Sequence, residues 1–108
     1  MPFHDPSTRV GKQVIPGLTM RTFWGENMLV AVVNLEPNTV VPAHSHPHEQ
    51  CSYLMEGEVE FNLDGERRAM QPGELVFIPG GVKHSVIAGS QPVRILDMFS
   101  PPREDLKF

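Results

Sequence analysis

The stretch His44-Ser45-His46-Pro47-His48-Glu49-Gln50 decides how this chain is organised, because it places three imidazoles and a carboxamide within seven residues. It lies between two apolar segments that have the character of β-strands. On an extended segment alternate side chains share one face, so we expect His44 and His46 to point the same way, with Cβ atoms about 6 to 7 Å apart. Two imidazoles at that separation can converge on one metal ion. Gln50 and the distant His84 are the best further ligands that the sequence offers.

A histidine-rich stretch alone can also be a solvated loop, so the interpretation depends on the second half of the chain. The segment from Gly73 to His84 predicts a turn, a buried strand, a tight turn and a histidine that opens another strand. Asn38 through Gly57 resembles the first sequence motif of the cupin superfamily, and Gly73 through His84 resembles the second. The resemblance implies a cupin double-stranded β-helix, which is a small all-β barrel or jelly roll.

Three positions depart from the residues that the family usually has, namely Asn38 for Gly, Gln50 for Glu and Ala88 for Asn. Asn tolerates the left-handed backbone for which Gly is normally used, so we expect Asn38 to make the same turn. Gln50 is the departure that affects chemistry. With four neutral donors, a divalent ion keeps its full double charge and becomes a stronger Lewis acid.

The remaining sequence predicts an all-β chain. Eleven prolines and nine glycines separate short segments rich in Val, Ile, Leu and Phe, and no long window has a helical apolar period. We expect one cupin domain over residues 1–108, in which residues 1–11 form an arm. Nine strands are predicted: 12–15, 18–24, 28–35, 39–46, 50–55, 58–63, 74–79, 82–88 and 92–99. Because exposed strand edges invite aggregation, we expect a closed barrel that forms a homodimer through an outer sheet.

Composition disfavours several other classes of protein. The net charge is −4 and the basic residues are scattered, so we expect no nucleic-acid partner. The longest apolar runs have the length of strands, so we expect no membrane partner either. A single cysteine, Cys51, and the lack of a secretory leader lead us to expect a cytoplasmic protein. We assign Cys51 no role, since its strand parity is opposite to that of Gln50.

A second group of informative residues lies near the C-terminus. Asp97 interrupts an apolar strand, where a bare carboxylate is costly unless it is paired or lies in a wet cavity. It therefore either pairs with Arg94 or another arginine, or faces the mouth of the barrel as a general acid/base. Phe99 shares its parity and can form a wall for a ring-shaped ligand. Arg103 is either a solvated arginine or a planar fork that binds a substrate carboxylate.

The pattern His-Ser-His-Pro-His-Glu-Gln, joined with Asp-Met-Phe-Ser-Pro-Pro-Arg-Glu-Asp, resembles the KdgF family of cupins. That family converts 4,5-unsaturated monouronates, released from pectin or alginate, into linear 4-deoxy-5-keto uronates. The resemblance implies an enzyme whose small-molecule substrate is an acidic sugar. It implies one metal ion with four ligands: His44, His46, Gln50 and His84. It also implies three residues that line the catalytic pocket: Asp97, Phe99 and Arg103.

The expected donor set leaves the metal and the reaction open to alternatives. Three imidazoles and an amide oxygen suit Ni²⁺ or Zn²⁺ foremost, and they are compatible with Mn²⁺, Fe²⁺, Co²⁺ or Cu²⁺. Oxygen-activating iron commonly uses two histidines and a carboxylate, so the neutral set disfavours a metal-dependent dioxygenase without excluding it. A non-catalytic sugar-binding cupin is the other alternative. His48 follows Pro47, and we expect its side chain to face solvent.

Overall fold

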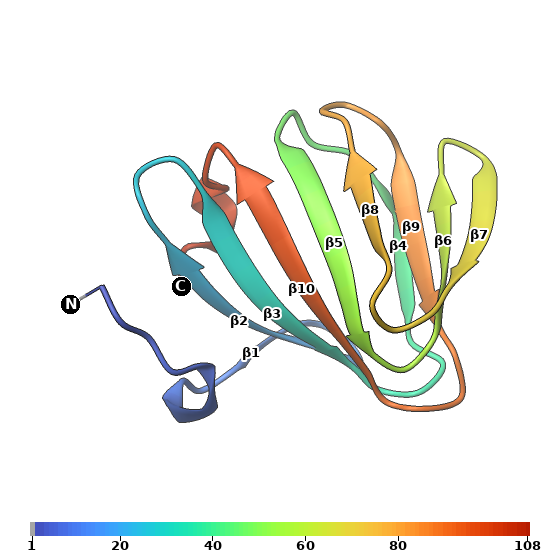
Figure 1. Cartoon of the computed structure of the whole chain (residues 1–108), viewed down its shortest axis with the longest axis horizontal. Coiled ribbons are helices and arrows are strands. Elements are labelled where there is room, and N and C mark those ends of the chain that lie inside the picture. Colours follow the sequence, from blue (N-terminus) through green and yellow to red (C-terminus); the bar gives the residue numbers. More distant parts are fainter. Residues whose placement is uncertain (1) are drawn as a thin grey trace.

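The computed structural model describes residues 2–108, which form ten β-strands and two short 3-10 helices (Figure 1). The strands are β1 (Lys12–Ile15), β2 (Leu18–Trp24), β3 (Leu29–Leu35), β4 (Val40–His44), β5 (Glu49–Glu56), β6 (Val59–Leu63), β7 (Glu66–Met70), β8 (Leu75–Ile78), β9 (His84–Ala88) and β10 (Val93–Ser100). The helices are η1 (Pro6–Thr8) and η2 (Glu104–Leu106). Within residues 2–108, no helix is both long and apolar enough to cross a membrane.

The strands form two antiparallel sheets. One has six strands in the order β1-β2-β3-β10-β5-β8, and the other has four in the order β4-β9-β6-β7. β10 lies between β3 and β5, far from both in sequence, so the last strand completes the centre of the larger sheet (Figure 1). Two sheets built from such crossed connections form a jelly roll, and the predicted all-β fold is confirmed.

The period-two pattern of the sequence explains which side of each sheet is buried. Along β3, Leu29, Ala31, Val33 and Leu35 are at most 3% exposed, whereas the side chains between them are half-buried. The inward residues of both sheets form one apolar core, with Leu54 and Ile78 fully enclosed. Burial of each such side chain contributes about 1.5 to 3 kcal/mol before entropy is counted, so this core supplies the driving force for closing the sandwich.

β7 is a strand that the sequence did not predict. Four of its five residues are exposed and only Met70 is buried, so the segment lacks the apolar alternation of a strand. Its backbone nevertheless pairs with β6 from Val59 opposite Met70 to Leu63 opposite Glu66. An edge strand can be held by its hydrogen-bonded ladder with little apolar burial, which is why composition alone missed it.

β4 is shorter than the predicted strand over residues 39–46. The register between β4 and β9 shifts between Val41 and His44, around Pro42, which has no N–H to donate to a ladder. The strand ends at His44, and His46 lies in the following loop. The expected sharing of one strand face by His44 and His46 is therefore wrong, and the loop brings His46 to His44 by another route.

Two turns require backbone conformations that the sequence anticipates. Asn38 has φ of 64°, so it makes the left-handed turn for which the family usually has Gly. Gly57 has φ of 83°, and a Cβ placed there would lie 2.5 Å from the carbonyl oxygen of Pro92. Its turn therefore excludes a side chain both by conformation and by contact.

The N-terminal segment is tied to β2 and to the C-terminal residues. Arg9 lies 4.5 Å from the centre of the Phe23 ring and donates hydrogen bonds to the backbone oxygens of Thr22 and Phe108. Its own carbonyl accepts a hydrogen bond from Arg21. These contacts hold the end of the chain beside the larger sheet. The division into one domain with an arm over residues 1–11 stays a prediction, and Met1 lies outside the described residues.

Candidate active site

Three imidazoles converge at one end of the sandwich. β4 and β9 pair so that His44 lies opposite His84, with ring centres 4.2 Å apart. His46, in the loop after β4, places its ring 5.9 Å from His44 and 5.0 Å from His84. One nitrogen of each ring lies within 4.8 Å of the other two. The three side chains are therefore positioned to bind one metal ion, as the sequence predicted for these histidines.

Each of the three imidazoles is oriented by a backbone carbonyl that contacts its Nδ1. For His44, His46 and His84 these carbonyls belong to Pro42, His48 and Val82, at 2.9, 3.1 and 2.9 Å respectively. A carbonyl oxygen only accepts, so each Nδ1 carries the proton and each Nε2 keeps a free lone pair. Burial lowers the pKa of His46 and His84, which favours the neutral imidazole that a metal needs.

Two nitrogen atoms in this cluster have lone pairs that a bound cation would satisfy. The Nε2 atom of His84 is buried and has no hydrogen-bond partner within residues 2–108. The Nε2 atom of His46 lies 2.9 Å from Oε1 of Gln50, although neither atom carries a proton in this arrangement. Two acceptors at that separation repel each other unless a positive charge lies beside them. The donor set of three imidazoles and one amide oxygen therefore fits a divalent metal ion.

Gln50 also connects this cluster to Asp97. Its Nε2 atom donates to the hydroxyl of Ser52 at 2.9 Å, and that hydroxyl donates to Oδ1 of Asp97 at 2.5 Å. Ser52 and Asp97 lie directly opposite each other on β5 and β10. Sequence reasoning missed Ser52. The available signal was its position two residues after Gln50, which places a second polar side chain on the same inward face of an otherwise apolar strand.

Asp97 lines the cavity and forms no ion pair with any other residue that the structure describes. Arg94, which the sequence offered as its partner, instead lies 3.9 Å from Glu56 and donates to Asn34. Among residues 2–108, none of the ion pairs includes Asp97. Burial raises the pKa of Asp97 to about 6, although the hydrogen bonds of Ser52 and Gln50 act in the opposite direction. A carboxyl group of this kind can exchange protons near neutral pH.

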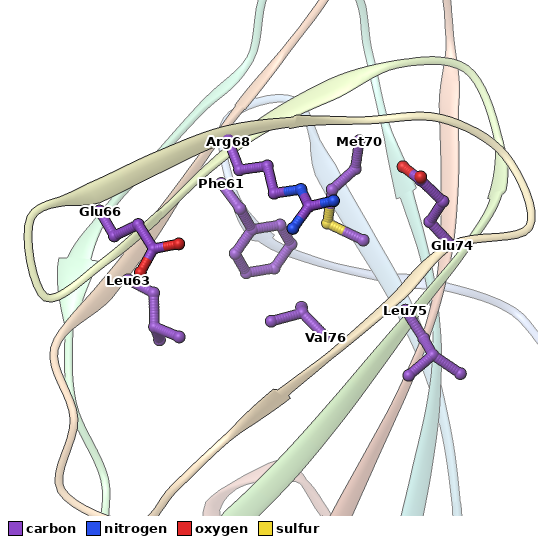
Figure 2. Close-up of a pocket in the computed structure, with 8 residues that line it drawn as sticks. All are labelled: Phe61, Leu63, Glu66, Arg68, Met70, Glu74, Leu75 and Val76. Atoms are coloured by element: carbon purple, nitrogen blue, oxygen red, sulfur yellow. The ribbon is translucent and has the colours of Figure 1, made fainter.

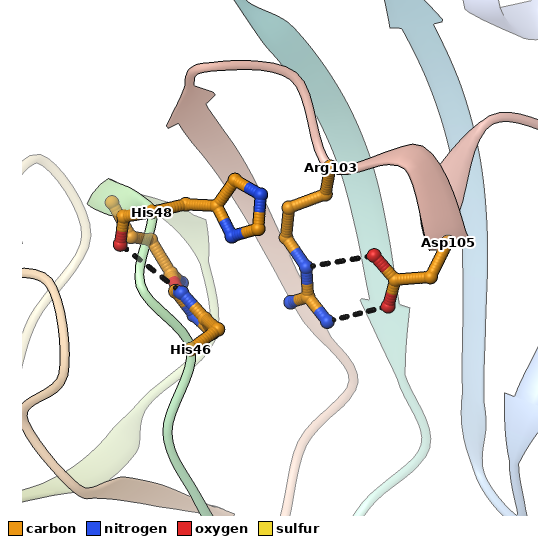
Figure 3. Close-up of polar contacts among 5 residues, drawn as sticks. His46, His48, Arg103 and Asp105 are labelled. Carbon is orange, nitrogen blue, oxygen red and sulfur yellow. Dashed lines mark hydrogen bonds and ion pairs between the residues drawn. The ribbon is translucent and has the colours of Figure 1, made fainter.

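Arg103 is fixed at the same end of the cavity. Its guanidinium carbon lies 5.1 Å from the centre of the Phe99 ring, and its side chain is only 17% exposed. Its Nη2 and Nε atoms donate to the two carboxylate oxygens of Asp105, at 2.7 and 3.3 Å (Figure 3). Asp105 thus occupies one edge of the guanidinium, which sequence reasoning did not anticipate because the residue stands in an irregular polar tail. Nη1 and the second hydrogen of Nη2 remain for a ligand.

His48 does not face solvent as the sequence predicted. Its ring centre lies 5.7 Å from that of His46, and its Nδ1 atom is buried without a hydrogen-bond partner in the described residues. Figure 3 shows its ring turned toward Arg103. The physical reason is the hydrogen bond between the carbonyl of His48 and the ring of His46, which folds the loop back and turns the side chain inward.

One cavity of about 340 Å³ lies beside the imidazole cluster, and its volume is within the range of small-molecule sites. Its polar lining is His44, Gln50, Ser52, His84, Asp97, Arg103 and Asp105, and the rest of its wall is largely apolar. A separate hollow of about 370 Å³ lies between β7 and β8, where the side chain of Arg68 extends over Phe61 toward Met70 (Figure 2). That second hollow contains none of the predicted site residues.

The family of this chain is shown by a match between most of its sequence and one family model. Residues 31–99 match the family model described as the cupin domain. The chain is a cupin. This cupin is 25% identical over 83 residues to the pectin degradation protein KdgF of Dickeya dadantii, which covers 76% of each protein. It superimposes on the structure of KdgF from a Halomonas species with a TM-score of 0.93, at 26% identity and 98% coverage of both chains. The predicted resemblance to KdgF is confirmed.

Other cupins with different reactions are also similar to the chain. A gentisate 1,2-dioxygenase from a Streptomyces species is 34% identical over 70 residues, which cover 64% of this chain but 19% of the dioxygenase. Cupins of different activity thus share this scaffold, and the reaction must be argued from the residues of the site.

Replacing His84 tests whether the imidazole cluster binds metal. We expect His84→Ala to retain less than about a tenth of the metal of the wild type after dialysis, since it removes a donor that has no other partner. Elemental analysis of protein purified without an affinity tag measures this. His4→Ala is the control, because His4 lies against Phe23 outside the site. Equal metal content in His84→Ala and the wild type would show that His84 is not a ligand.

Proposed function

We propose that this cupin is a metal-dependent enzyme that converts 4,5-unsaturated monouronates, derived from pectin or alginate, into linear 4-deoxy-5-keto uronates. The observation that carries the proposal is the chain of hydrogen bonds from Gln50 through Ser52 to Asp97, which joins the proposed metal ligands to a half-buried carboxyl group in one cavity. The likeness to KdgF over nearly the whole chain supports the same reaction.

The metal site has four proposed ligands: His44, His46, Gln50 and His84. A divalent ion bound there, Ni²⁺ or Zn²⁺ foremost, supplies Lewis acidity and attracts the carboxylate and hydroxyl oxygens of an acidic sugar. The protein contributes four neutral donors to this site. They leave its net charge at two, which favours binding of an anionic substrate.

Asp97 is the proposed general acid. The substrate has an enol ether between C4 and C5, and Asp97 donates its proton to C4 while a water molecule adds at C5. The proton released by that water returns to Asp97. The bond between C5 and the ring oxygen of this hemiketal then breaks, which gives a ketone at C5. The former ring oxygen stays on C1 as a hydroxyl, and together with the anomeric hydroxyl it makes C1 an aldehyde hydrate. Loss of water from C1 gives the aldehyde, so substrate and product are isomers.

Arg103 and Phe99 are the proposed binding residues. Arg103 lines the cavity, and its remaining N–H groups can donate hydrogen bonds to a substrate carboxylate. The two hydrogen bonds to Asp105 restrain the guanidinium from rotating. Phe99 is 3% exposed and contacts both Arg103 and His46 through its ring. It forms an apolar wall for one face of the sugar ring.

Replacing Asp97 tests the proton transfer. We expect Asp97→Asn to remain folded and metal-loaded and to lose about 10²- to 10⁴-fold in the rate at which the ultraviolet absorbance of an unsaturated monouronate disappears. Asp64→Asn, in an exposed turn, is the control and should be as active as the wild type. A rate for Asp97→Asn within about threefold of the wild type would remove Asp97 from this role. Oxygen uptake in the same assay would identify a dioxygenase instead.

Arg103→Lys tests recognition of the carboxylate. Lysine keeps the charge but loses the planar fork that is held by Asp105 and stacked near Phe99, so we expect the KM for the uronate to rise about tenfold with a smaller change in kcat. Steady-state kinetics measures both constants. Arg68→Lys, in the other hollow, should leave them unchanged. An unaltered KM in Arg103→Lys would assign this arginine a role only in the structure of the tail.

A further inference from the structure

His48 is the imidazole of the histidine-rich stretch that the proposed metal site leaves unused. It lies outside the group of three histidines whose ring nitrogens converge within residues 2–108. Its Nδ1 atom is nevertheless screened from water and has no hydrogen-bond partner in that part of the chain. A polar atom that loses water without gaining a partner destabilises the folded chain, so a ligand that pairs with this nitrogen would recover that loss.

The backbone of the loop fixes where the His48 ring lies. The carbonyl oxygen of His48 accepts a hydrogen bond from Nδ1 of His46 at 3.1 Å, and the two ring centres are 5.7 Å apart. From the other side, Gly81 donates its N–H to the carbonyl oxygen of His46 at 2.8 Å. A Cβ on Gly80 would collide with the carbonyl oxygen of Pro47, so the turn after β8 lies directly against the loop. The inward direction of the His48 ring is therefore set by the fold.

The His48 ring is turned toward the guanidinium of Arg103 (Figure 3). The Phe99 ring centre lies 5.6 Å from that of His46 and 5.1 Å from the guanidinium carbon, so the loop and the C-terminal tail meet beside Phe99. Hydrogen bonding from Arg103 is the main cause that lowers the pKa of Asp105, and the charge of a protonated His48 acts in the same direction. The bonds to Asp105 use Nε and Nη2, so Nη1 of Arg103 keeps no hydrogen-bond partner among residues 2–108.

We propose that His48 is a further substrate-binding residue, which donates a hydrogen bond from Nδ1 to the carboxylate that Arg103 binds. The inference rests on the proposed function, because it requires an acidic sugar in this cavity. One carboxylate oxygen accepts from Nη1 of Arg103 and the other accepts from His48. The half-buried ring reaches this oxygen by turning about its Cβ–Cγ bond, a torsion with a broad preference. With the proton on Nδ1, Nε2 accepts from water.

The surroundings of His48 favour a carboxylate over a neutral hydroxyl. The guanidinium is a permanent cation, and the carboxylate of Asp105 occupies one of its edges. The unpartnered Nη1 and Nδ1 atoms are then two donors that belong to different side chains at the same end of the cavity. A carboxylate has two acceptor oxygens and a negative charge, so it satisfies both donors at once, whereas a hydroxyl satisfies one and leaves the cation without an anion.

Binding of a saturated analogue tests the role of His48 without turnover. We expect isothermal titration of the metal-loaded protein to show that His48→Phe, which keeps a ring but no nitrogen, raises the Kd for D-galacturonate at least about tenfold. His48→Asn places an amide N–H near the position of Nδ1, and its Kd should stay within about threefold of the wild type. His4→Phe is the matched control outside the site and should bind as the wild type does.

The methyl ester of galacturonate separates recognition of the carboxylate from an effect on shape. The ester lacks the negative charge, so it should bind the wild type more weakly, and His48→Phe should change its Kd less than about threefold. Metal content and circular dichroism should be the same in all variants. Equal losses for acid and ester in His48→Phe, a wild type that does not distinguish the two, or loss of metal in His48→Phe would each overturn the inference.

Steady-state kinetics distinguishes a failure of this inference from a failure of the proposed function. The KM for an unsaturated monouronate should rise about tenfold in His48→Phe with a smaller change in kcat, and His48→Asn should restore it. A wild type that prefers galacturonate to its ester but does not convert the unsaturated monouronate would reject the proposed reaction and support the binding role. Conversion with the same KM in the wild type and in His48→Phe would keep the reaction and reject the role of His48.

Discussion

The site depends on three hydrogen bonds between imidazoles and the backbone. Each carbonyl that contacts an Nδ1 atom fixes both the direction of a ring and the nitrogen that carries its proton, so three Nε2 lone pairs point to one place. Two of the carbonyls, from Pro42 and Val82, come from residues just before His44 and His84, at the ends of paired strands. The third, from His48, comes from the loop itself. The fold therefore orients the donors before any ion binds, which reduces the cost of assembling a metal centre.

Gln50 differs from a glutamate at this position in two ways, since its side chain is neutral and can donate a hydrogen bond. Its oxygen faces His46, while its nitrogen donates to Ser52, which in turn donates to Asp97. A carboxylate at this position has no hydrogen to donate, so it would break that relay as well as lower the charge of the site. The amide of Gln50 is therefore proposed both to act as a neutral ligand and to fix the orientation of the proposed acid. Arg103 is supported similarly, because Asp105 holds one edge of its guanidinium and Phe99 lies against its face.

The sequence predicted much of the fold and of the donor set, for definable reasons. Period-two burial marks strands such as β3, and the spacing of the two cupin motifs brings His84 to His44 through the pairing of β4 with β9. β7 escaped prediction because an exposed edge strand needs no apolar face. His48, Ser52 and Asp105 were missed for a different reason. Their positions depend on a loop reversal, a cross-strand neighbour and an irregular tail, and none of these has a periodic signature.

The central claim is that a neutral ligand at position 50 keeps the net charge of the metal site at two and connects the site to Asp97 by hydrogen bonds. The kinetics of metal-saturated Gln50→Glu test this claim. Its metal retention should equal or exceed that of the wild type, and its kcat/KM on an unsaturated monouronate should fall. A substrate carboxylate about 4 Å from the new charge meets a repulsion of at most about 4 kcal/mol at an effective dielectric constant of about 20. Even a quarter of that weakens binding about fivefold. The account predicts at least this loss, and equal catalytic efficiency in the two proteins would contradict it.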